Sequence, residues 1–340
     1  MRIAVLADFG EISNPLVKIL SESHQVAVVR ENVCEDTPFK NVTFIKGSVG
    51  LKDNQLWQNL KDFRAEIIVD LVAKNQLKAN EVIDNCRSFC KRAVVLSTSS
   101  VYAAYERFFS SANGPIEPTP IKETGRTRTS FESFKRQNKE STALDYLHAE
   151  TAFCAQNEVI CTVLRSSYIF SPDIVQRTTF ENFNNLTNGL SYFCMNKEFA
   201  NWTFDFTYID NLVEGIRWAI MQTPTSHTIY NISSKQCLSQ LEYYQIMAQE
   251  LDWQGFVGLT NERDSNGLNF NQSIRLDITK IVEAGYKELV SAEDAVKKVI
   301  NLEKYIDETV KSGKAANDNA SDDQSHKDVV LYHLQTLTEI

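Results

Sequence analysis

The stretch Val94-Val95-Leu96-Ser97-Thr98-Ser99-Ser100-Val101-Tyr102 begins with aliphatic residues and ends in a cluster of hydroxyl groups. Further along, Tyr146-Leu147-His148-Ala149-Glu150 has a tyrosine at the expected start of a helix. A short apolar run bounded by polar residues predicts a buried strand. We therefore expect a strand that ends in hydroxyl groups, followed later by a helix that opens on Tyr146.

Strands and helices alternate on both sides of this stretch. We expect strands over residues 2–7, 25–30, 42–46, 66–73, 93–97 and 160–165, with helices over 14–23, 56–63 and 79–89. Strands that are almost continuously apolar are typical of a parallel sheet covered on both faces. Because the crossovers in such sheets are right-handed, the pattern predicts an α/β fold with a doubly wound, parallel Rossmann-type sheet.

The sequence also indicates how the chain divides into domains. We expect residues 1–165 to form the nucleotide-binding domain, and 166–310 to form a smaller C-terminal substrate lobe interleaved with the sheet. The polar stretch 106–141 is expected to be a long surface loop on the ligand side. Residues 311–328 have almost no large apolar side chain, which predicts a flexible linker.

The last segment, 329–340, is apolar again. It carries Val330, Leu331, Leu334 and Leu337 at helical spacing, although a helix this short is not stable alone. We therefore expect the segment to dock on its own subunit or on a neighbouring one.

Composition narrows the class of protein. The net charge of −9 argues weakly against nucleic acid or an anionic membrane as the main partner. No apolar run reaches the roughly 18 residues that span a bilayer. Residues 1–6 read as the start of a strand, so we expect no signal peptide. The seven cysteines are scattered, which indicates a reduced, cytoplasmic protein and supports no metal site.

The hydroxyl-ended strand and the later tyrosine resemble the catalytic half of the extended short-chain dehydrogenases/reductases, the NAD-dependent epimerase/dehydratase family. Residues 165–172 and 206–212 are similar to two further segments of that family, so the resemblance covers roughly residues 1–305. It implies a nicotinamide cofactor, a small or nucleotide-linked substrate, and a homodimer.

The resemblance assigns catalytic positions. Thr98, four residues before Tyr102, stands at the Ser/Thr position that orients a substrate oxygen, and Tyr146 stands at the proton-exchanging position. Two plainer roles stay open: Thr98 as part of a hydroxyl cap on the strand end, and Tyr146 as a packing residue on its helix.

The family has a lysine four residues after the tyrosine, and this chain has Glu150. A carboxylate beside the phenol would disfavour phenolate, which weakens the expected chemistry. Because Glu150 lies four residues after Tyr146, on the same face of the expected helix, we expect it to reach the phenol or a bound ribose. Glu150 is therefore a third candidate catalytic residue. Lys135 and Lys139 are the lysines that could fold over the site instead.

The dinucleotide loop is also altered. Where the family has three glycines, this chain has Ala7, Gly10 and Ser13, so whether the turn still binds a dinucleotide stays open. Arg30 ends the second strand, where an arginine favours the 2′-phosphate of NADP over NAD, although a solvated surface arginine is equally compatible. Ala73, at the end of the predicted strand 66–73, is a further expected cofactor contact.

Three functions follow. The first is a divergent NAD(P)-dependent epimerase- or reductase-like enzyme that acts on a hydroxyl or keto group of a small or nucleotide-linked substrate. The second is a catalytically silent Rossmann-fold protein that binds a ligand or a partner. The third is an enzyme that uses the same pocket without a dinucleotide.

Overall fold

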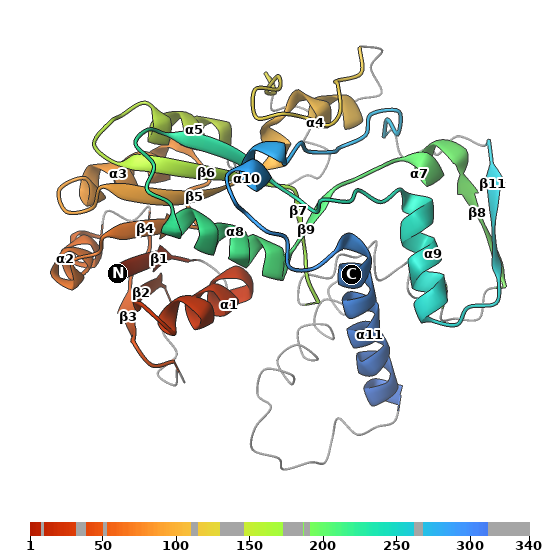
Figure 1. Ribbon diagram of the computed structural model, residues 1–340, viewed down its shortest axis with the longest axis horizontal. Helices are drawn as coiled ribbons and strands as arrows, with labels where there is room; N and C mark the ends of the chain where they lie inside the picture. Colours follow the sequence, from red (N-terminus) through yellow and green to blue (C-terminus); the bar gives the residue numbers. More distant parts are fainter. Residues whose placement is uncertain are drawn as a thin grey trace.

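The computed structural model describes residues 1–7, 10–31, 39–49, 53–109, 115–129, 146–172, 186, 191–261 and 268–311. Its centre is a seven-stranded sheet with the order β10-β6-β5-β4-β1-β2-β3, in which all neighbouring strands are parallel (Figure 1). The order runs outward in both directions from β1 and β4, as in a doubly wound sheet. The predicted Rossmann-type fold is confirmed.

The strands lie close to their predicted positions. They are β1 (Arg2–Leu6), β2 (Gln25–Arg30), β3 (Val42–Lys46), β4 (Ile67–Asp70), β5 (Arg92–Thr98), β6 (Ile160–Ser166) and β10 (Thr228–Ile232). The prediction of a strand through residue 73 was wrong by three residues. Strand β4 ends at Asp70 because its carboxylate accepts from the backbone N–H groups of Val72 (2.8 Å) and Ala73 (2.9 Å), which turns the chain.

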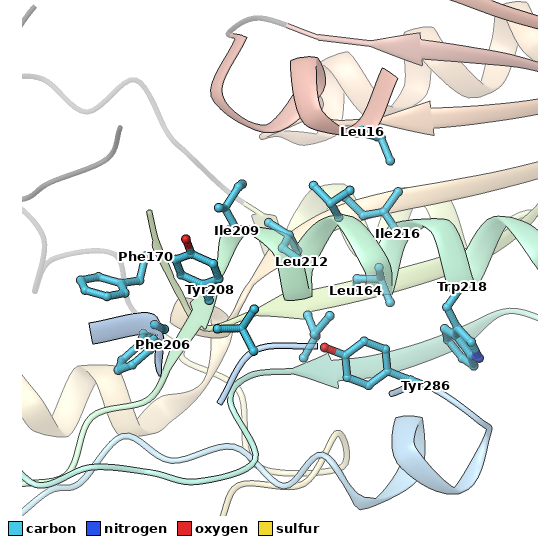
Figure 2. Close-up of a cluster of buried hydrophobic side chains, with 14 of the residues drawn as sticks. Leu16, Leu164, Phe170, Phe206, Tyr208, Ile209, Leu212, Ile216, Trp218 and Tyr286 are labelled. Carbon is cyan, nitrogen blue, oxygen red and sulfur yellow. The ribbon is translucent and has the colours of Figure 1, made fainter. Parts of the chain in front are cut away.

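Helices cover both faces of the sheet. They are α1 (Gly10–Ser21), α2 (Asn54–Phe63), α3 (Gln76–Cys86), α5 (Tyr146–Cys154) and α8 (Ile209–Met221). Successive strand residues point to opposite faces. Ile3 of β1 accordingly packs in one buried cluster with residues of α1 and α8 (Figure 2), and Ala4 packs in the other with residues of α2, α3 and α5.

The second half of the chain builds the smaller lobe. It contains two short strand pairs, β7 (Tyr168–Phe170) with β9 (Phe206–Tyr208) and β8 (Tyr192–Asn196) with β11 (Phe256–Thr260), and the helices α7 (Lys197–Asn201), α9 (Gln240–Glu250), α10 (Thr279–Glu283) and α11 (Ala292–Lys311). Strand β10 returns to the main sheet beside β6. The division at residue 165 stays a prediction.

The stretch 106–141 is not all loop. Its first residues belong to α4 (Ala103–Phe108), which follows the short 3-10 helix η1 (Ser99–Val101). The prediction was wrong there because the aromatic residues of α4 pack in a third buried cluster with Trp202 and Phe270. Residues 110–114 and 130–141, the linker from residue 312 and the segment 329–340 lie outside the described residues. No helix in the described ranges is both long and apolar enough to cross a membrane.

A buried acid lies where the lobe joins the sheet. Asp205 is 2% exposed, and its carboxylate accepts from the N–H of Leu276. Burial raises the pKa of Asp205 from its usual 3.8 to about 6, and hydrogen bonds from Cys237 and from the N–H of Leu276 only partly oppose this.

This acid should make stability depend on pH. A carboxyl group with a raised pKa binds its proton more tightly in the folded chain than in the unfolded chain. Its contribution to the free energy of unfolding is therefore fully present at low pH, and it is lost as the pH rises from about 4 to about 6. The expected loss in free energy of unfolding is about 3 kcal/mol. Asp205→Asn should remove that part of the pH profile in urea unfolding, whereas Asp252→Asn, at an exposed aspartate, should keep it. Equal profiles for the wild type and Asp205→Asn would contradict the assignment.

Candidate active site

A cavity of about 360 Å³ opens at the carboxyl ends of the central strands. The last residues of β5 and β6, the segments that follow β1, β4 and β6, and the start of α5 line it: Leu96, Ser97, Thr98, Ser166, Glu11, Ile12, Leu71, Lys74, Ser167, Tyr168, Ile169 and Tyr146. In open α/β sheets, ligands bind in the crevice beyond the strand ends where the strand order reverses, which here is between β1 and β4. The volume lies at the lower end of the range of small-molecule sites.

Thr98 and Tyr146 both line this cavity, although they are far apart in sequence. Thr98 is the last residue of β5, and its Oγ1 accepts from the N–H of Ser100 at 3.2 Å, which caps η1. The hydroxyl therefore caps the strand end, as one alternative held, and can still donate its own proton to a ligand. Tyr146 opens α5 as predicted, and its half-buried ring also packs against the cluster around α4.

Glu150 faces other partners than those expected. It is 3% exposed, and its carboxylate pairs with Arg165 of β6, with Nη2–Oε2 at 2.6 Å and Nε at 3.1 Å from both oxygens. The hydroxyl of Ser97 donates to the same carboxylate. We expected Glu150 beside the Tyr146 phenol or a ribose, and its bonds to Arg165 and Ser97 do not support that position, because a buried charge requires a paired charge. Glu150 is linked to the cavity through its hydrogen bond with Ser97, which is one of the lining residues.

The ion pair belongs to a larger buried network. Arg165 also donates to the hydroxyl of Tyr102 (3.0 Å) and to the backbone oxygen of Glu123 (3.1 Å). Tyr102 in turn donates to Asn231 of β10 at 2.6 Å. Burial alone would lower the pKa of Arg165, but its bonds to Glu150 raise it more, so the guanidinium stays charged. The network joins α5 to three neighbouring strands of the sheet.

Lys74 is a charged residue of the cavity wall that was not predicted from the sequence. It follows the turn after β4, next to Ala73, and it is the only lysine or arginine among the residues that line the cavity in the described part of the chain. Ala73 itself is buried, 4% exposed. The signal for Lys74 was its place directly after a strand of an open sheet, where strand ends converge. Lys135 and Lys139 lie outside the described residues.

Tyr168 brings a second phenol to the cavity. Its hydroxyl oxygen is buried and accepts or donates no hydrogen bond within the described ranges. Burial raises the pKa of Tyr168, so the group stays protonated. A buried, protonated hydroxyl in a cavity wall is a donor for a ligand oxygen.

Helix α1 begins shortly after the end of β1, as the first helix of a Rossmann-type fold does. Ala7 is buried and its N–H donates to the oxygen of Val29 at 3.1 Å, whereas Gly10 begins α1. A Cβ at Gly10 would approach the side chain of Asn14 to 2.7 Å, so a glycine fits this position. Ser13 is fully buried, and Glu11 and Ile12 beside it reach the cavity.

Arg30 is held in place rather than freely solvated. Its Nη2 donates to Ser13 Oγ at 2.8 Å and to Asn14 Oδ1 at 2.5 Å, and its guanidinium lies over the ring of Phe44 at 5.8 Å. Arg30 is half-buried, and its contact with a dinucleotide stays a prediction. A positive charge is fixed at the end of β2, beside the first turn of α1.

These walls fit half of a nicotinamide dinucleotide. Ile12, Leu71, Leu96 and Ile169 offer apolar surface to a flat ring, and the hydroxyl groups and Lys74 offer partners to a ribose. The described residues contain no group of three or more His, Cys, Asp and Glu side chains that could hold a metal ion. The cavity can therefore orient a hydroxyl or carbonyl between proton donors, next to a bound flat ring.

No family sequence model matches the chain, and no curated protein matches it significantly. Solved structures do match it. UDP-glucose 4-epimerase from Thermotoga maritima, solved with UDP-glucose, has a TM-score of 0.63 at 15% identity and covers 91% of this chain and 100% of its own. The Bordetella bronchiseptica enzyme WbmG with NAD and UDP has a TM-score of 0.64 at 17% identity and covers 89% and 94%.

A third similar structure is UDP-N-acetylglucosamine 4-epimerase from Methanobrevibacter ruminantium, with a TM-score of 0.63 at 13% identity over 89% of this chain and 98% of its own. At such identities the likeness concerns the fold. The chain has the fold of these enzymes over most of its length.

Proposed function

We propose that this chain is a divergent NAD(P)-dependent epimerase- or reductase-like enzyme that acts on a hydroxyl or keto group of a small or nucleotide-linked substrate. The observation that carries the proposal is one cavity, at the reversal of strand order, that is lined by both Thr98 and Tyr146. Two of the similar structures support it, because one holds NAD with UDP and another holds UDP-glucose. A cytoplasmic homodimer, as the resemblance implies, belongs to the same proposal.

The chemistry divides between cofactor and protein. A bound nicotinamide would accept or donate the hydride, with Ile12 and Leu96 of the cavity wall against its ring. Ala7, Gly10, Ser13, Arg30 and Ala73 would lie near the rest of the dinucleotide. Tyr146 would exchange a proton with the substrate hydroxyl, while Thr98 would donate a hydrogen bond to the same oxygen. Glu150 contributes as a positioning residue, because it fixes the Ser97 hydroxyl of the cavity wall.

Titration of the purified chain with NADH and NADPH, followed by nicotinamide fluorescence, tests the proposal. We expect binding of both, tighter for NADPH, because Arg30 places a positive charge at the end of β2. Tighter binding of NADH would overturn the preference, and binding of neither would overturn the cofactor and with it the proposed reaction.

Lys74 should carry part of the affinity. An ammonium that bonds a ligand oxygen in a cavity contributes about 1.5 kcal/mol, so Lys74→Met should weaken dinucleotide binding about tenfold. Lys74→Arg should lose less, because the charge remains. Lys61→Met, at an exposed lysine of α2, is the matched control and should bind like the wild type. An unchanged dissociation constant for Lys74→Met would place the ammonium outside the binding contact.

One observation favours the silent alternative. With Glu150 paired to Arg165, helix α5 presents no cation to the Tyr146 phenol, so proton transfer would lack the help that a lysine gives in the family. A protein that binds dinucleotide tightly but converts no sugar nucleotide would fit this second function. Conversion followed by chromatography of UDP-glucose and UDP-galactose distinguishes the two.

A further inference from the structure

An apolar groove of about 550 Å³ lies far from the candidate active site, between α9 and β11. Its walls include Leu241, Tyr244, Ala248, Trp253 and Leu259 together with the exposed amides of Gln245 and Gln249, and no Asp, Glu, Lys, Arg or His is among its described lining residues. Leu259 is 46% exposed. A partly exposed, largely apolar groove of this kind marks an interaction site more often than a plain surface.

Helix α9 packs between α11 and the small strand pair β8–β11. Helix α11 packs against it, with Lys297 Nζ at 3.9 Å from Glu250 Oε1 and Asn301 Nδ2 at 3.4 Å from Glu250 Oε2. Figure 1 shows α11 on one side of α9 and the pair β8–β11 on the other. The groove therefore lies on the side of α9 that faces β11, away from α11.

We propose that the C-terminal segment 329–340 of the same chain occupies this groove as an amphipathic helix. Its apolar residues Val330, Leu331, Leu334 and Leu337 have the spacing by which a helix lays one face into a hydrophobic groove. A helix over 329–340 would be about 18 Å long and α9 is about 16 Å long, so the two match in length. The proposal is independent of the proposed reaction.

The connection is long enough. Helix α11 continues from Asn301, beside the end of α9, to Lys311, a distance of about 15 Å. Residues 312–328, rich in Ser, Asn, Asp and Lys, would span at most about 56 Å and on average about 23 Å as a coil. The segment can therefore return to the groove without moving any element of the fold.

Hydrogen exchange on the full chain tests the proposal. In Leu334→Asp/Leu337→Asp we expect amides of 329–340 and of β11 to exchange at least tenfold faster than in the wild type. Gln335→Asp/Thr336→Asp adds the same charge to the same segment outside the apolar stripe, and it should exchange like the wild type. Leu259→Asp, on the same face of β11 as Val257, should speed exchange in 329–340 as well. Equal exchange in the wild type and Leu334→Asp/Leu337→Asp would overturn the proposal.

Light scattering with size-exclusion chromatography identifies which copy supplies the segment. Protection of 329–340 that is the same at low and high protein concentration supports docking within one chain. Protection that is lost on dilution, together with a mass that falls to the 38.7 kDa of one chain, would mean that a second copy supplies the segment and would overturn the proposal.

Discussion

Glu150→Lys is expected to destabilise the fold by about 3–5 kcal/mol, enough to unfold many domains of ordinary stability. The change places an ammonium where the Arg165 guanidinium now meets a carboxylate at 2.6 Å, and it leaves two like charges together in a buried site. It also leaves the Ser97 hydroxyl without its acceptor. From the sequence alone, the same substitution restores a family lysine and should raise cofactor affinity or turnover in a site that is otherwise intact. The contacts of Glu150 reverse that expectation.

Urea unfolding measured by circular dichroism would check this result. Thr151→Lys, at the exposed next position of α5, is the matched control and should change the free energy of unfolding by no more than about 0.5 kcal/mol. Replacing both partners, in Glu150→Met/Arg165→Met, should cost less than Glu150→Lys alone, because no unpaired charge stays buried. If Glu150→Lys unfolds at the same urea concentration as the wild type, the ion pair is not what holds α5 to the sheet.

The main sheet could be predicted because its signals are local. Each central strand is a short apolar run, and burial on both faces requires that pattern whatever the neighbouring strands are. The end of a strand is harder to predict from the sequence. Strand β4 ends at Asp70 because the carboxylate of Asp70 accepts hydrogen bonds from the backbone N–H groups of Val72 and Ala73. Helix α4 was missed because its stability comes from packing on Trp202 and Phe270, which lie far along the chain.

Some residues of the candidate site could likewise be predicted from the sequence, and others could not. Thr98 and Tyr146 were predicted from the family resemblance, which places them at a strand end and a helix start, and the fold brings these ends together at one cavity. The partner of Glu150 does not follow from the sequence, because helical spacing relates it to Tyr146 and says nothing of Arg165 on the neighbouring β6. Lys74 was overlooked for a related reason: its role depends on which strand ends meet in space.

Tyr146→Phe is expected to lower kcat by about 10²–10⁴-fold on any substrate that the chain converts, with KM little changed. The ring stays in place against its apolar neighbours, so the substitution removes only the phenol proton from the cavity. Tyr192→Phe, at an exposed tyrosine of β8, is the matched control and should keep wild-type turnover. Dinucleotide binding should survive in Tyr146→Phe, which separates loss of proton transfer from loss of the site. A variant that keeps full turnover would remove Tyr146 from the reaction and would leave Tyr168, the other phenol of the cavity, as its proton donor.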